Sequence, residues 1–137
     1  MVYITRRERF SAAHRLFRED WDDEKNFEIF GACSNPNWHG HNYILYVTVK
    51  GNINPETGFL VNLKDLSAIL KDKVISQVDH KNINTETAFM KGKIVSTENL
   101  AVAVWNVLFP EIQSIGAKLH CVKIEETENN FVEYFGE

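Results

Sequence analysis

The pattern of apolar and polar positions predicts β-strands near both ends of the chain. Residues 2–10, VYITRRERF, mix β-forming residues with charges and end near SAAH, and residues 42–51, NYILYVTVKG, form a second run rich in β-branched residues. Near the C-terminus, KLHCVKIEET at 118–127, then ENN, then FVEYFG at 131–136 predict a strand, a turn and a strand. The chain is therefore expected to begin and end with an antiparallel hairpin.

Helical spacing of apolar residues occupies the middle of the chain. Residues 64–78 predict an amphipathic helix, whose stripe contains Leu66, Ile69, Leu70, Lys73 and Val74. A second helix begins near Ser96, a good N-cap, with Glu98 in its first turn opposing the helix dipole. Its apolar stripe consists of Leu100, Ala103, Val104, Val107 and Leu108, and Pro110 is expected to limit it.

The connecting segments carry weaker signals. WDDEKNFEIF at 21–30 predicts a short helix. NINPETG at 52–58 has Asn, Pro and Gly in hairpin-like order, and FLVNL at 59–63 is expected to be extended.

Together these elements predict an α+β fold in the order β, β, α, α, β, β. The expected architecture is an antiparallel four-stranded sheet with two helices on one face, in a single domain spanning residues 1–137. Open sheet edges are a liability unless they are covered or paired, so we expect a homo-oligomer.

Composition and charge exclude several classes of function. Hydrophobic residues make up 44% of the 137 residues and charged residues 25%, which is an ordinary globular balance. The net charge of −4 argues against a nucleic-acid partner, and the longest apolar runs are too short to span a membrane. The beginning of the chain lacks a signal-peptide layout and only two cysteines occur, Cys33 and Cys121, so free thiols in the cytoplasm are expected.

Four arginines lie near one another at the start of the sequence, namely Arg6, Arg7, Arg9 and Arg15. They could bind a small anionic ligand or form the solvated edge of a strand, and the sequence leaves both interpretations open.

The most specific chemical signal is NPNWHGHNY at residues 35–43. Residues i and i+2 of an extended chain point to the same side, about 6.5–7 Å apart, so His39 and His41 can reach one ion. His14, at the end of the first strand, would lie on the neighbouring strand of the hairpin. Three neutral imidazoles with an open fourth position form a catalytic zinc site.

Two alternatives to a catalytic site remain open at this point. Each histidine could be an ordinary solvated or hydrogen-bonded side chain. Cys33, six residues before His39, could instead provide a fourth ligand and close the site. The chain would then be a non-catalytic binding module stabilised by zinc.

Five ordered blocks resemble the 6-pyruvoyl-tetrahydropterin synthases: FSAAHRL, CSNPNWHGHNY, VDHKNIN, VSTENLA and EETENN. The resemblance covers residues 9–137. It implies a tunnelling fold (T-fold), in which subunits join their sheets into a barrel as a trimer and two trimers stack into a hexamer.

The resemblance also implies roles for particular residues. It makes His14, His39 and His41 the ligands of zinc (Zn2+). Cys33 matches the catalytic thiol, Asp79 and His80 the proton-relay pair, and Glu126 the pterin anchor. It also places the hydroxyls of Ser96 and Thr97 near the pterin, although both residues could be helix caps and nothing more.

Strand parity supports part of this assignment. Glu126 shares a face with His120, Val122 and Ile124, so its carboxylate points to the core side and needs a partner. The adjacent amino and ring N–H donors of a pterin would satisfy it. Asp79 and His80 can interact only if the end of the preceding helix turns the carboxylate towards the ring, because adjacent side chains of a strand diverge.

The implied reaction converts 7,8-dihydroneopterin triphosphate to 6-pyruvoyl-tetrahydropterin with loss of triphosphate. The alternative is 6-carboxy-tetrahydropterin synthase of queuosine biosynthesis, which uses the same substrate and also releases acetaldehyde. Five residues, 34–38, separate Cys33 from His39, and this spacing resembles the pyruvoyl branch.

Overall fold

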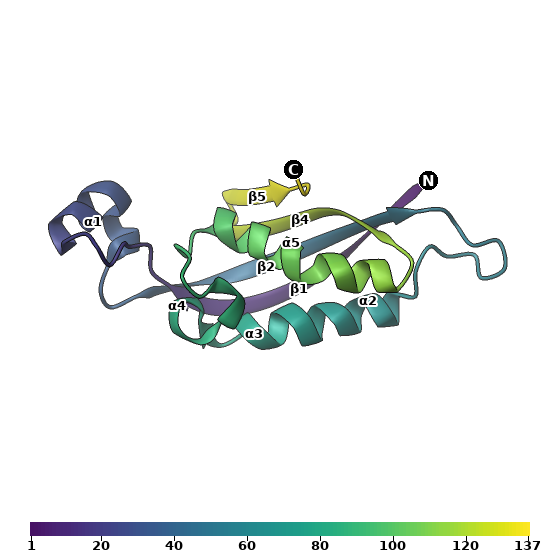
Figure 1. Ribbon diagram of the computed structural model, residues 1–137, viewed down its shortest axis with the longest axis horizontal. Coiled ribbons are helices and arrows are strands. Elements are labelled where there is room, and N and C mark those ends of the chain that lie inside the picture. Colours follow the sequence, from purple (N-terminus) through teal and green to yellow (C-terminus); the bar gives the residue numbers. More distant parts are fainter.

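A computed structural model describes all 137 residues and contains one five-stranded sheet. In spatial order its strands are β3 (Lys81–Asn82), β1 (Val2–His14), β2 (His39–Gly51), β4 (Lys118–Thr127) and β5 (Asn130–Tyr134). Figure 1 shows β1 and β2 as the long central pair. All pairings are antiparallel except that of β3 with β1, which is parallel.

The fifth strand corrects the prediction of a four-stranded sheet. β3 contains only Lys81 and Asn82 and pairs with Ala13 and Ala12 of β1. Two residues are too few to show a period, so the sequence offered no signal for this strand.

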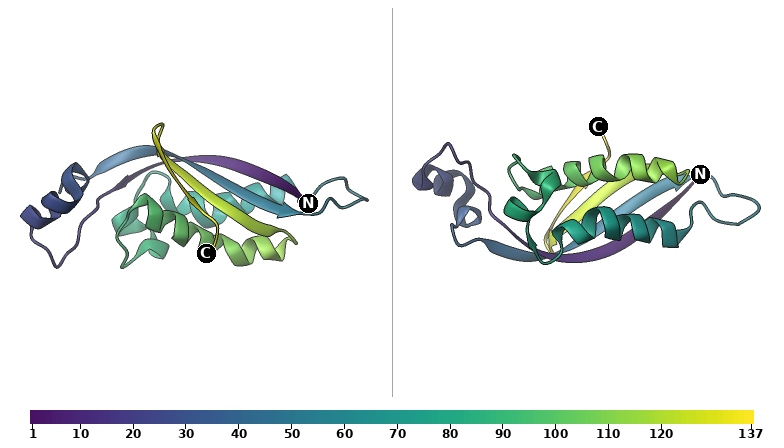
Figure 2. Two further views of the ribbon diagram at one scale, coloured as in Figure 1. Left: turned by 90° about the horizontal axis from the view of Figure 1, so that it is seen from above. Right: turned by 60° about the horizontal axis from the view of Figure 1, so that its bottom comes forward.

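Helices cover one face of the sheet, as the sequence predicted. Their bounds are α1 (Asp23–Phe30), α2 (Leu63–Leu70), α3 (Ser76–Val78), α4 (Ile83–Glu86) and α5 (Thr97–Ser114). Figure 2 shows α2, α3 and α5 lying along the same face of the strands, with α1 carried beyond them at one end of the β1–β2 pair. Short 3-10 turns occupy Gly31–Ser34 and Ala88–Met90.

The helix predicted at 64–78 is present, with one irregularity. A π-helical turn, Lys71–Ile75, joins α2 to α3. Leu66, Leu70, Val74 and Val78 are fully buried at four-residue intervals and face the sheet, whereas Lys73 of the predicted stripe is exposed. Burial of this stripe explains why the segment stays helical across the wider turn.

Two predicted boundaries were wrong. Helix α5 continues through Pro110 to Ser114, because Ile112 beyond the proline is fully buried and holds the last turn against the core. Residues 59–61 form bends rather than a strand, and Leu63 already belongs to α2. Asn62 caps α2 through its side chain, and a Cβ on Gly51 would clash with Leu60, so this segment is the packed entrance to the helix.

The core lies between the sheet and the helices. Tyr43, Leu45, Val47 and Val49 alternate along β2 and are all buried. In β4 this alternation is interrupted by a bulge opposite Thr48 and Val49. His120 therefore does not share the core face with Val122 and Ile124, contrary to the parity prediction, and its ring contacts Tyr3 and Phe135 instead.

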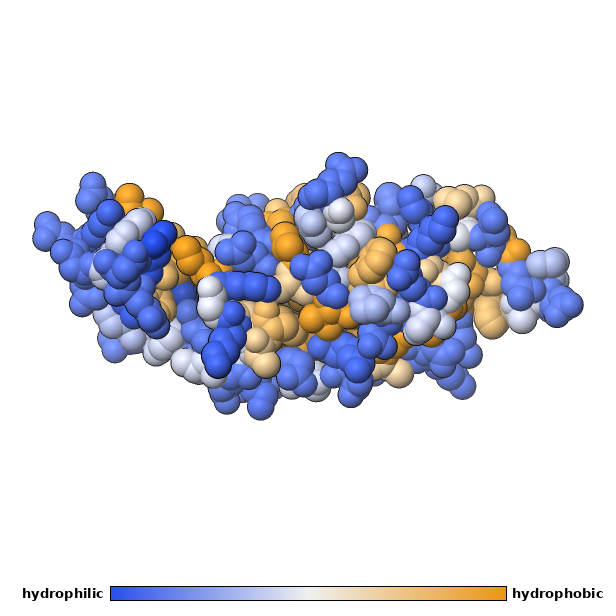
Figure 3. All heavy atoms as spheres, in the orientation of Figure 1, coloured by the Kyte–Doolittle hydropathy of each residue, from blue (hydrophilic) through white to orange (hydrophobic).

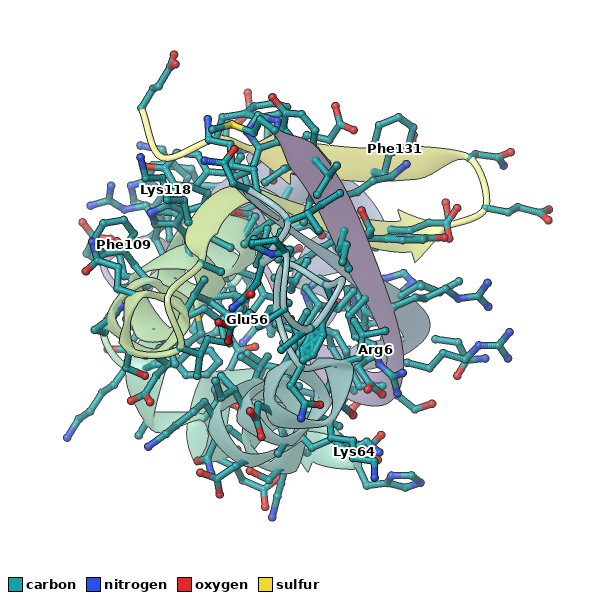
Figure 4. All side chains as sticks on the ribbon, turned by 90° about the vertical axis from the view of Figure 1, so that its right-hand side faces the viewer. Arg6, Glu56, Lys64, Phe109, Lys118 and Phe131 are labelled. Carbon is teal, nitrogen blue, oxygen red and sulfur yellow. The ribbon has the colours of Figure 1, made fainter.

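Both outer edges of the sheet are largely open. On its β3 side, β1 is paired only at Ala12 and Ala13, and β5 has no neighbour beyond β4. Figure 4 shows Arg6 on β1 and Lys64 on α2 near one of these edges, and Phe131 on β5 at the other. Hydrophilic residues dominate the α1 end in Figure 3, and no helix is both long and apolar enough to cross a membrane.

Candidate metal centre

The three histidines singled out in the sequence lie together. His14 is directly opposite His39 in the β1–β2 register, and His41 follows two residues later on the same face of β2. One ring nitrogen from each residue falls within a group whose members all lie within 4.8 Å of one another. The predicted grouping is confirmed, and the antiparallel hairpin is what creates it.

The ring nitrogens of this triad are suited to a metal ion. The Nδ1 of His14 lies 2.8 Å from the Val95 carbonyl oxygen, and a proton on Nδ1 that donates to this oxygen leaves Nε2 with a free lone pair. Nε2 of His14, both nitrogens of His39 and Nε2 of His41 are buried and have no hydrogen-bond partner. Burial lowers the pKa of His14 and of His39, which favours the neutral form that binds metals.

Cys33 is not a member of the metal-binding group, which contains histidines only. It lies half-buried in the 3-10 turn after α1, where its carbonyl accepts a hydrogen bond of 2.9 Å from the Leu16 amide. The closed four-ligand site considered above is therefore not what the structure shows. Three protein ligands and an open fourth position fit the catalytic arrangement.

Glu126 is brought to the triad from β4. Its Oε1 lies 3.1 Å from Nε2 of His41, although the contact is not aligned well enough to be a hydrogen bond. Its Oε2 accepts a hydrogen bond from the Thr97 hydroxyl at the start of α5. The Glu126 side chain is 25% exposed, and it borders a hollow of about 320 Å³ that Thr97 and Phe131 also line. The carboxylate of Glu126 is thus turned inwards, as strand parity predicted.

Ser96 acts as the cap predicted from the sequence. Its hydroxyl accepts a hydrogen bond of 3.1 Å from the Asn99 amide in the first turn of α5. This leaves Thr97, rather than Ser96, as the hydroxyl that contacts Glu126.

Asp79 and His80 do form a pair. His80 has a left-handed backbone, with φ of 58°, and this conformation brings its Nδ1 to 3.1 Å from Oδ2 of Asp79. The other carboxylate oxygen accepts a hydrogen bond of 2.9 Å from the Ser11 amide, which holds the pKa of Asp79 below its usual value. The turn at the end of the helix therefore brings together the side chains of Asp79 and His80, which would point apart on an extended strand.

The pair is nevertheless separate from the triad within this chain. The His80 side chain is 83% exposed and borders a hollow of about 510 Å³, which is lined by Ser11, Gly40 and His41 among others. It is not part of the metal-binding group. The fold of this chain therefore does not bring the Asp79–His80 pair onto the three nitrogens.

The four arginines do not form one anion site. Arg6 bonds to Glu8 at 3.0 Å, whereas Arg7 and Arg9 lie on the opposite face of β1. Arg15 is held by the Ser34 carbonyl at 2.7 Å.

Trp38 immediately precedes His39, the first residue of β2, and has a left-handed backbone with φ of 67°. Its amide donates to the Asn35 carbonyl at 3.0 Å, and its ring meets Phe17 edge-on at 6.4 Å. Trp38 and Phe17 line the largest hollow, of about 630 Å³. A bulky residue rarely adopts this conformation, so the turn that delivers His39 is held by its surroundings.

Sequence analysis did not identify one residue of the site, Tyr43. It shares strand parity with His39 and His41, its side chain is 1% exposed, and its hydroxyl has no partner. The period-two pattern places Tyr43 on the face of the two histidines, but the sequence assigned this residue no role at the site.

Comparison with known proteins places this geometry in a family. Residues 3–137 match the profile described as "6-pyruvoyl tetrahydropterin synthase". The chain is 45% identical to the "6-pyruvoyl tetrahydrobiopterin synthase" of Dictyostelium discoideum, over 99% of this chain and 97% of that protein. It is 30% identical to the "6-carboxy-5,6,7,8-tetrahydropterin synthase" of Bacillus subtilis, over 90% of this chain and 78% of that protein.

A solved structure agrees with these relatives. The 6-pyruvoyl tetrahydropterin synthase of Caenorhabditis elegans superposes with a TM-score of 0.86 and 36% identity, covering 99% of this chain and 96% of the other. The chain belongs to the 6-pyruvoyl tetrahydropterin synthase family, and the resemblance seen in the five sequence blocks is confirmed.

Proposed function

We propose that this chain converts 7,8-dihydroneopterin triphosphate to 6-pyruvoyl-tetrahydropterin with loss of triphosphate, as a zinc-dependent lyase formed by the single domain 1–137. The observation that carries the proposal is the group of unpartnered nitrogens of His14, His39 and His41 beside an inward-facing carboxylate, Glu126. The identity to the Dictyostelium relative over nearly the whole chain supports the pyruvoyl product.

The three histidines would hold Zn2+, which supplies Lewis acidity that lowers the pKa of a bound hydroxyl group. Zinc fits the residues because its usual ligands include neutral imidazoles and because His14 already has the carbonyl partner that orients a ligating ring.

Glu126 and Thr97 would bind the pterin ring. A carboxylate can accept two parallel hydrogen bonds from an amino group and an adjacent ring N–H, and the Thr97 hydroxyl fixes the direction of its second oxygen. Glu126 lines the hollow beside these residues and its Oε1 lies 3.1 Å from Nε2 of His41, so a ring bound there would present its side chain towards the triad.

Cys33 and the Asp79–His80 pair would move protons. Cys33 would act as a base when deprotonated, and Asp79 would orient the ring of His80 through the 3.1 Å contact. Since the His80 ring is directed to solvent, we propose that the pair completes the site of a neighbouring subunit.

An assembly of this kind would use the open edges of the sheet. Pairing of the exposed edge of β1 with β5 of another copy would join the sheets into a barrel. We propose a homo-oligomer, either a trimer or a hexamer made of two trimers, with the T-fold architecture of the family.

The decisive experiment incubates the zinc-loaded protein with 7,8-dihydroneopterin triphosphate and measures triphosphate and acetaldehyde together. Triphosphate without acetaldehyde is expected. Release of both products would assign the chain to the carboxy branch, and release of neither would refute the synthase function in both forms.

Matched variants locate the chemistry. Glu126→Gln should weaken pterin binding, because the amide replaces one acceptor by a donor, whereas Glu125→Gln on the opposite strand face should not. Cys33→Ala should lower turnover without removing the metal. If Cys33→Ala instead released zinc, the non-catalytic module with a closed site would be the better description.

A further inference from the structure

The buried side-chain nitrogen and oxygen atoms that lack a hydrogen-bond partner are confined to one place in this protein. They are four ring nitrogens of His14, His39 and His41, and the hydroxyl oxygen of Tyr43. A bound metal ion would account for one nitrogen of each histidine, which is three of the four, but hydroxyl groups of neutral tyrosines are not its usual ligands. The hydroxyl therefore needs a different explanation.

The ring of Tyr43 is held in a fixed position next to the triad. It stacks on Phe10 with centroids 4.7 Å apart and planes 9° from parallel. Its edge meets the rings of His14 and His41 at 5.9 Å and 5.5 Å. Tyr43 is 1% exposed, and its hydroxyl has no hydrogen-bond partner within the chain.

The Tyr43 hydroxyl offers a donor that no atom of the chain accepts from. The ring contacts with His14 and His41 set the phenol beside the place where a ligand held at the triad would lie. A phenylalanine would keep the stacking on Phe10 without burying an unsatisfied polar atom.

We propose that Tyr43 is a substrate-binding residue whose hydroxyl donates a hydrogen bond to an oxygen atom of the polyhydroxylated side chain of the ligand held at the triad. The proposal rests on the function proposed above and adds a residue that recognises the side chain rather than the pterin ring. Glu126 would then select the ring and Tyr43 the oxygenated tail.

The test combines one variant with two ligands that do not react. Zinc-loaded wild type and Tyr43→Phe are titrated by calorimetry with neopterin, which carries a trihydroxypropyl side chain, and with 6-methylpterin, which lacks the hydroxyls. Loss of one hydrogen bond should weaken neopterin binding about tenfold and leave 6-methylpterin binding unchanged. Tyr46→Phe, whose ring lies near Lys123 on the other face of β2, is the matched control.

A second measurement separates binding from folding. Metal-free Tyr43→Phe should unfold at the same or a higher temperature than wild type, because the variant removes an unsatisfied buried hydroxyl. Lower stability of the metal-free variant, or equal weakening of both ligands, would overturn the proposal while leaving the synthase function intact. If the wild type bound neither pterin, the proposed function would fail first and this proposal with it.

Discussion

The Nδ1 nitrogen of His14 lies 2.8 Å from the carbonyl oxygen of Val95, although 81 residues separate the two in sequence. Val95 immediately precedes Ser96, the N-cap of α5. The loop before the helix therefore also orients the ring of His14, one of the three histidines whose nitrogens could hold a metal ion. This relationship couples the helix cap to the candidate metal centre.

Replacing Ser96 with Ala should affect both stability and metal binding. Loss of the cap is expected to cost about 1 kcal/mol of unfolding free energy. A displaced Val95 carbonyl should also weaken zinc binding by up to about tenfold. Denaturant unfolding and competition with a chelator measure the two effects. Ser114→Ala, at the other end of α5, serves as the control, and equal zinc affinity in both variants would show that the cap and the centre are independent.

Zinc should stabilise the folded chain, and this stabilisation should require His39. At a free zinc concentration a hundred times Kd, binding to the native state alone adds about 2.7 kcal/mol. His39→Ala should remove most of the zinc-dependent rise in Tm, whereas His120→Ala should retain it because its ring contacts Tyr3 and Phe135. Equal zinc-dependent shifts in both variants would argue against the triad.

Because of Asp79, we expect the stability of the folded chain to depend on pH in the acid range. Its pKa is held below the ordinary value of 3.8, chiefly by the Ser11 amide, so the folded state favours the ionised form. The resulting stabilisation is complete above pH 3.8 and is lost as the pH falls through the lower folded pKa. NMR titration of the Asp79 carboxyl carbon should show the depressed midpoint.

Removing the Asp79 side chain tests the same contact at neutral pH. Asp79→Ala should lose about 1 kcal/mol, because partial exposure screens a charged hydrogen bond. Asp79→Asn keeps an acceptor for the Ser11 amide and should lose less. If the two variants were equally destabilised, the charge rather than the hydrogen bond would be responsible.

The two cysteines should differ in reactivity. Cys121 is buried within β4, and burial raises the pKa of its thiol, so little thiolate forms at neutral pH. Cys33 is half-exposed and lies outside the metal-binding group. Iodoacetamide should therefore label the zinc-loaded protein once, with Cys121→Ser labelled and Cys33→Ser unlabelled. Protection of Cys33 by zinc would indicate that its sulfur binds the metal.

Much of the fold followed from local patterns. The alternation in β2, the four-residue spacing in α2 and the Ser96 cap each concern neighbouring residues, and each was found where predicted. The wrong predictions concern residues whose state depends on distant partners. Pro110 stays helical because Ile112 is packed against the core, and the bulge in β4 turns His120 away from it.

The candidate site divides in the same way. The spacing of His39 and His41 places both side chains on one face of their strand, and strand parity places Glu126 on the core face of another. Both are properties of a single extended chain, so the sequence alone determined them. The ordered blocks also determined the family. The sequence predicted contact between Asp79 and His80 only on condition that the chain turns at the end of the helix. The left-handed backbone of His80 meets that condition.

Only the tertiary structure decided which of these groups meet. The β1–β2 register sets His14 opposite His39, and the β4 pairing carries Glu126 to His41. Helix α5 supplies Thr97, and the loop before it supplies the Val95 carbonyl. It also left the Tyr43 hydroxyl buried beside the triad and Cys33 outside it. Such contacts arise from packing elements that are distant in sequence, and packing depends on the shape of the whole core rather than on any local period.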